Sequence, residues 1–130
     1  MHNGRMSGIL FFDGFCGMCT RSANFVLKVN RTGGVQIEPL QGPGVAERLG
    51  IAPSDLLEST RWLDSSGAVY SGAEAANAAM SAALGTKFPL VLYRIPGIRF
   101  IEDAVYRWVA AHRYRFPGTT PYCESHPAAC

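Results

Sequence analysis

Apolar residues follow strand-like patterns in two short stretches near the start of the chain. A run of four apolar residues, from Ile9 to Phe12, precedes Gly14, which is typical of a short buried strand. Residues 35–40 instead alternate apolar with polar side chains, and a proline closes the run. The pattern therefore predicts strands over residues 7–13 and 35–40.

Helical spacing of apolar residues marks three longer stretches. In residues 20–31 the apolar side chains fall on one broad face, and Gly33 and Gly34 end the pattern. Residues 73–84 are rich in alanine, whose small side chain allows close packing against a sheet. The most regular stretch is 98–113, and we expect its apolar stripe to lie in the core. This stripe consists of Ile98, Ile101, Val105, Trp108, Val109 and His112.

Turn and breaker residues complete the set of elements. Residues 60–63 and 68–70 flank a turn that ends in Gly67, which predicts a β-hairpin. The remaining predictions are a short helix over 43–49, a further helical turn over 53–58, and a short apolar segment over 88–95.

The predicted elements follow one another in the order β-α-β-α-β-β-α, with extra helices towards the C-terminus. A parallel β-α-β unit followed by a hairpin and a helix matches a thioredoxin-like α/β architecture. We expect a single domain, because 130 residues are close to the commonest domain size and 48% of them are apolar. Its parts are a core over about residues 7–85, C-terminal helices over about 87–115, and an irregular tail over 116–130.

Composition excludes several classes of protein. The net charge of +2 is too small to indicate nucleic-acid binding. No apolar run approaches the roughly 20 residues of a membrane span or the roughly 7–15 of a signal peptide. We therefore expect a cytoplasmic protein with no integral membrane segment. In a reducing compartment, a close cysteine pair is more often catalytic or metal-binding than a structural disulfide.

Cys16 and Cys19 form such a pair, at the junction of the first strand and the first helix. A helix N-terminus has unpaired N–H groups and partial positive charge, which stabilise a thiolate. We predict that Cys16 attacks a disulfide, and that Cys19, expected to be the more buried thiol, resolves the mixed disulfide. Gly14 and Gly17 would leave room for a substrate chain. The substrate is then a thiol or disulfide protein or small molecule, and no cofactor is implied, because the dithiol carries the electrons.

Asp13 ends the apolar strand directly before this loop. Its carboxylate is a candidate for proton exchange with Cys19. It could equally cap the helix or brace the loop, and the sequence does not decide between these roles.

The tail carries Cys123, His126 and Cys130. These residues could bind zinc, form a tail disulfide, pass electrons to the first pair, or remain two unpaired thiols. The alternative to an enzyme is accordingly a non-catalytic zinc-binding or interaction module. It would use Cys16 and Cys19 with Cys123 and either His126 or Cys130.

Asp13, Cys16 and Cys19 match the pattern D-x-x-C-x-x-C, which resembles the DCC family of predicted thiol-disulfide oxidoreductases. The segments LDSSGAVYSGAEA (63–75) and YRWVAAHRYR (106–115) also resemble that family's hairpin and C-terminal helix. The resemblance implies a thioredoxin-like fold and redox activity. One departure from ordinary thioredoxins is that Ser59 and Thr60 stand where a cis-proline shapes the substrate-binding backbone.

Overall fold

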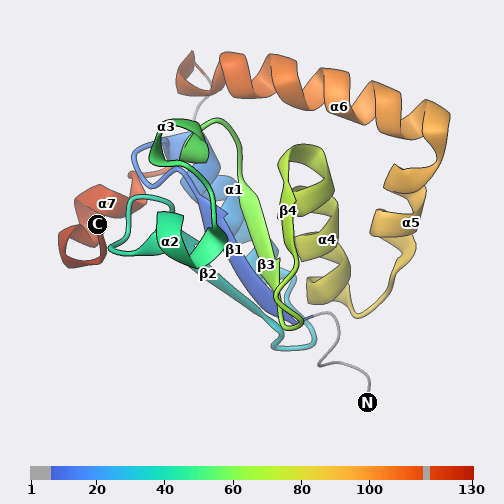
Figure 1. The fold of residues 1–130 in the computed structure, drawn as a ribbon, viewed down its shortest axis with the longest axis horizontal. Helices are drawn as coiled ribbons and strands as arrows, with labels where there is room; N and C mark the ends of the chain where they lie inside the picture. The colour runs from blue at the N-terminus through green and yellow to red at the C-terminus, as the bar shows by residue number, and fades with distance from the viewer. Residues whose placement is uncertain (1–6, 116–117) are drawn as a thin grey trace.

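A four-stranded mixed sheet organises the computed structural model, which describes residues 7–115 and 118–130 (Figure 1). Its strands are β1 (Gly8–Phe12), β2 (Val35–Pro39), β3 (Arg61–Asp64) and β4 (Val69–Ser71), in the spatial order β2-β1-β3-β4. β1 is parallel to β2 and antiparallel to β3, and β3 and β4 form the predicted hairpin. The thioredoxin-like fold class and the element order are confirmed.

The larger apolar core lies on one face of this sheet. It is built by α1 (Gly17–Lys28) and α4 (Gly72–Leu84), whose buried side chains meet those of Leu10, Phe12 and Trp62. α1 begins three residues earlier than predicted. The smaller core, on the opposite face, joins Phe11 to the short helices α2 (Val45–Leu49) and α3 (Pro53–Leu56). Because side chains alternate along a strand, adjacent residues of β1 serve the two cores.

Two further helices lie outside α4 (Figure 1). The apolar segment at 88–95 forms helix α5 (Phe88–Arg94), and the regular stretch forms α6 (Pro96–Ala111). The expectation that the α6 stripe lies in the core is wrong, because no residue of α6 is buried. Ile101, Val105 and Trp108 are 63%, 56% and 57% exposed. The predicted end of this helix at Pro117 lies outside the described residues.

The tail is more ordered than its sequence suggests. After a short 3₁₀ turn (Arg113–Arg115), residues 118–130 include α7 (Tyr122–Ser125) and a second 3₁₀ turn (Pro127–Ala129). A disulfide joins Cys123 to Cys130. Of the alternatives left open for the tail, the structure therefore has the disulfide and not two unpaired thiols. Within residues 7–115 and 118–130, no helix is long and apolar enough to cross a membrane. The division into core, helices and tail at the expected boundaries stays a prediction.

Candidate active site

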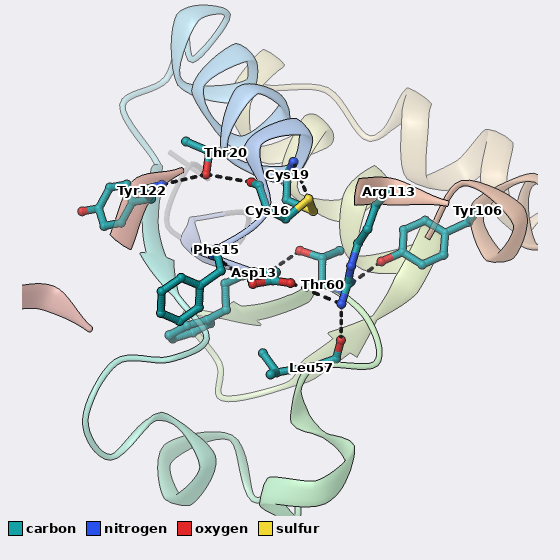
Figure 2. Close-up of a disulfide and its surroundings, with 12 residues drawn as sticks. Asp13, Phe15, Cys16, Cys19, Thr20, Leu57, Thr60, Tyr106, Arg113 and Tyr122 are labelled. Atoms are coloured by element: carbon teal, nitrogen blue, oxygen red, sulfur yellow. Dashed lines mark hydrogen bonds and ion pairs between the residues drawn. A yellow bond between two sulfur atoms is a disulfide. The ribbon is translucent and has the colours of Figure 1, made fainter. Parts of the chain in front are cut away.

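A disulfide between Cys16 and Cys19 lies directly after β1, where the first helix begins (Figure 2). Cys16 is the N-cap of α1, with extended backbone angles of φ −101° and ψ 116°. Its Sγ accepts a hydrogen bond of 3.1 Å from the backbone N–H of Cys19. The predicted strand-to-helix placement of the pair is therefore confirmed, and one of the unpaired donors of the helix N-terminus is directed at sulfur.

The two sulfur-bearing residues differ in exposure, and in the opposite sense to the one expected. Cys16 is 0% exposed, whereas Cys19 is partly exposed. The expectation that Cys19 is the more buried residue is wrong. The physical reason is that the C-terminal part of the chain covers Cys16, which no local pattern in the sequence indicates.

Residues 118–123, here called the closing segment, make this cover. The N–H of Thr119 donates to the carbonyl of Gly17 at 3.3 Å, and the N–H of Cys123 donates to the carbonyl of Gly14 at 2.9 Å. A Cβ at Gly14 would overlap Cys123 Sγ, and one at Gly17 would lie 2.6 Å from the Thr119 carbonyl. The space that Gly14 and Gly17 were predicted to leave for a substrate chain is thus filled by this chain itself.

Tyr122 anchors the closing segment to the first helix and to the core. The backbone N–H of Tyr122 donates to Thr20 Oγ1 at 3.1 Å, and the Thr20 hydroxyl in turn donates to the carbonyl of Cys16 at 3.0 Å (Figure 2). The Tyr122 ring meets the ring of Phe12 edge-on, with 5.3 Å between centroids. These contacts connect the tail to the cysteine loop through both polar and apolar groups.

Asp13 is 3% exposed beneath the cysteine loop. Its Oδ1 accepts hydrogen bonds from the N–H of Phe15 at 3.0 Å and from Gln41 Nε2 at 2.7 Å. Its Oδ2 forms an ion pair of 3.2 Å with Arg113. These contacts join the cysteine loop to Gln41, which follows β2, and to the 3₁₀ turn that follows α6. Such an arrangement fits the bracing role left open for Asp13.

Thr60, which stands where thioredoxins have their cis-proline, is also engaged. Its N–H donates to the hydroxyl of Tyr106 at 2.9 Å, and its own hydroxyl donates to the carbonyl of Phe11 at 2.6 Å. Burial of Tyr106 raises the pKa of its hydroxyl. The backbone donor that an extended substrate would need here is therefore already bound to α6.

A cavity of about 680 Å³ opens beside Cys19. Its wall is mostly apolar and comes from β1, α1, α4 and α6. Members from these elements include Phe12, Met18, Val26, Met80 and Val109. The Asp13–Arg113 pair, Thr60 and Tyr106 contribute polar groups to the lining, as do Arg21 and Ser22 of α1. Cys16 is not among the lining residues, so the two sulfurs of one disulfide face different surroundings.

The zinc arrangement predicted as an alternative is not assembled. No group of three or more His, Cys, Asp or Glu side chains suited to a metal occurs among the described residues. Cys123 and Cys130 are bonded to each other, and the ring of His126 stacks on Tyr122 with 4.2 Å between centroids. Sequence reasoning assigned no site role to Gln41, Tyr106 or Arg113. Tyr106 and Arg113 lie in the segment that resembles the family's C-terminal helix, but only the tertiary fold brings them to the site.

Comparison with known proteins gives one family match. The family described as DCC1-like thiol-disulfide oxidoreductase matches residues 10–119. No curated protein and no solved structure matches the chain.

Proposed function

The chain belongs to the DCC1-like thiol-disulfide oxidoreductase family, and we propose that Cys16 and Cys19 are the pair that carries its redox chemistry. The observation that supports this most strongly is the N-cap position of Cys16. A sulfur that receives an N–H from the first turn of a helix is stabilised as a thiolate. The thiolate is the form that attacks disulfides and the form in which a sulfur leaves.

The proposed reaction is exchange of the protein's disulfide with the thiols of a substrate. One substrate thiolate displaces one protein sulfur, which gives a mixed disulfide and a protein thiolate. A second substrate thiolate then displaces the remaining protein sulfur. The substrate thiols are oxidised to a disulfide, and the Cys16–Cys19 disulfide is reduced by two electrons to a dithiol.

Bracing by Asp13 is part of the proposal. The carboxylate binds the N–H of Phe15, one residue before Cys16, and is held by Arg113 and Gln41. A positioning role for Asp13 predicts that Asp13→Asn slows exchange and lowers stability together. The proton-exchange role remains a prediction, which would instead alter the pH profile of the rate at unchanged stability.

The test is a redox titration in dithiothreitol buffers, with the disulfides mapped by mass spectrometry after alkylation. We expect a two-electron couple at Cys16–Cys19 in the full chain. Cys16→Ser and Cys19→Ser should each abolish it, and each should lower turnover in a disulfide reduction assay at least about 100-fold, because one thiol cannot complete the cycle. The paired change Cys123→Ser with Cys130→Ser is the control and should retain the couple. Unchanged turnover in Cys16→Ser would contradict the proposal.

Two features of Cys16 bear on the order in which the two cysteines act. Stabilisation of a thiolate at the N-cap favours Cys16 as the attacking sulfur. The complete burial of Cys16 argues against this role, because an attacking sulfur has to reach the substrate.

A further inference from the structure

We propose that the substrate meets Cys19 and not Cys16, and that it is a small apolar thiol bound in the cavity beside Cys19. This inference rests on the proposed redox function of the pair and adds to it the sulfur that is attacked and the class of substrate. Figure 2 shows Tyr122 on one side of the disulfide and Arg113 and Tyr106 on the other. The first side is closed, and the second borders the cavity.

Access decides which sulfur is attacked. Cys16 is 0% exposed, and the closing segment is hydrogen-bonded to Gly14, Gly17 and Thr20 around it. Cys19 is partly exposed and lines the cavity. A thiolate in the cavity can therefore reach Cys19 Sγ, whereas Cys16 Sγ requires the closing segment to move.

The arrangement also favours this direction of bond breaking. When a substrate thiolate forms a bond to Cys19 Sγ, the Cys16–Cys19 bond breaks and its electron pair stays on Cys16. Cys16 is the better leaving group, because the helix N-terminus and the Cys19 N–H stabilise its thiolate. A second substrate thiolate then attacks the substrate sulfur bonded to Cys19, which releases the substrate disulfide and leaves Cys19 as the second protein thiol.

The cavity indicates the size and polarity of the substrate. Its volume of about 680 Å³ is that of a small-molecule site. Of the charged residues in its lining, Arg113 and Asp13 form an ion pair and offset each other. Arg21, the other cation of the lining, is exposed, so water and salt screen its attraction for an anion. The mostly apolar wall therefore favours an apolar ligand over an anionic one, which would lose much of its water there.

Two features argue against an extended polypeptide as substrate. The surface beside Gly14 and Gly17 is occupied by residues 118–123. The backbone N–H of Thr60 is bound to Tyr106. Both positions would have to be vacated before a peptide chain could pair with this edge of the site.

The experiment uses the oxidised full chain and two aromatic thiols that differ in charge, para-thiocresol and para-mercaptobenzoate. The reaction is quenched in acid, the freed thiol is alkylated under denaturing conditions, and the mixed disulfide is located by mass spectrometry. We expect the aromatic group on Cys19 and the alkyl group on Cys16. We also expect para-thiocresol to react at least about tenfold faster than para-mercaptobenzoate.

Variants that fill the cavity give the second readout. Ala110→Phe and Ala76→Phe add a ring to the cavity wall from α6 and α4, and each should slow para-thiocresol about tenfold. Ala104→Phe, at an exposed position of α6 outside the lining, is the control and should react like the unmodified chain. Two filling variants are used so that one remains if the other fails to fold.

The possible outcomes separate the two proposals. An aromatic group found on Cys16, or equal rates for the two thiols with no effect of the filling variants, would overturn the inference while exchange itself stands. A Cys16–Cys19 disulfide that does not react even with dithiothreitol would overturn the proposed function, and the inference with it.

Discussion

Helices α4 and α6 are similar in length but are attached to the protein in opposite ways. α4 carries mainly alanine and buries Ala75, Ala79 and Ala83 to 0% exposure against the sheet. α6 has the more regular apolar stripe, yet none of its residues is buried. The comparison teaches that apolar periodicity predicts a helix without predicting which of its sides faces the protein.

Beside Val109 and Ala110, which line the cavity, α6 directs several polar side chains towards the rest of the protein. The Glu102 side chain accepts a hydrogen bond of 2.8 Å from Asn77, and the Asp103 carboxylate accepts one of 2.7 Å from Tyr93. Burial, with the hydrogen bond to Asp103 as a further cause, raises the pKa of Tyr93 to about 12. The hydroxyl of Tyr106 binds the backbone of Thr60. α6 is thus held by specific polar groups, whereas α4 is held by close packing.

The largest expected effect concerns Arg113, in the 3₁₀ turn that follows α6. Arg113→Met removes the ion pair to Asp13, whose buried carboxylate also accepts hydrogen bonds from Gln41 and the Phe15 N–H. We expect a loss of about 3 kcal/mol in the free energy of unfolding, measured by urea denaturation. Arg107→Met, at an exposed position of α6, is the control. Equal losses of stability in the two variants would show that the ion pair between Arg113 and Asp13 makes no specific contribution.

The next effect tests packing in α4. Ala79→Leu places three extra carbon atoms at a position of 0% exposure within the larger core. We expect a loss of about 2 kcal/mol in the same measurement. The matched change Ala104→Leu in α6 should alter stability by less than about 0.5 kcal/mol. A stability loss at residue 104 as large as that at 79 would contradict the contrast between the two helices.

A smaller effect isolates one hydroxyl. Tyr106→Phe keeps the ring but leaves the N–H of Thr60 without its acceptor, which we expect to cost about 1 kcal/mol. Amide hydrogen exchange at Thr60 should accelerate in the variant. The control is Tyr70→Phe, since the Tyr70 hydroxyl has no hydrogen bond in residues 7–115 and 118–130 of the structure. Unchanged hydrogen exchange at Thr60 would show that the hydrogen bond to Tyr106 does not hold α6 to the sheet.

The smallest expected effect concerns the exposed stripe itself. Trp108→Ser removes a large apolar side chain that is 57% exposed. We expect the free energy of unfolding to change by less than about 0.5 kcal/mol, because the side chain is not in the core. A loss of several kcal/mol in the free energy of unfolding, as for a tryptophan in a core, would instead support the sequence-based prediction that this stripe lies in the core.

The sequence predicted those features that depend on neighbouring residues. The strand at Ile9–Phe12, the hairpin and the placement of Cys16 at a helix start follow from short-range patterns and breaker residues. The burial of Cys16 was not predictable, because the contact between Thr20 and Tyr122 joins positions 102 residues apart. The partner of Asp13 was missed for the same reason, since Gln41 lies 28 residues further on.

The cover over Cys16 has a consequence for synthesis of the protein. Cys16 and Cys19 leave the ribosome long before Tyr122 and Cys123, whose hydrogen bonds to Thr20 and Gly14 hold the closing segment over the start of α1. During translation both thiols of the first pair are therefore open to oxidants and to each other before their surroundings are complete. The order of the chain favours pairing of Cys16 with Cys19, and of Cys123 with Cys130, over any cross-pairing between the two ends.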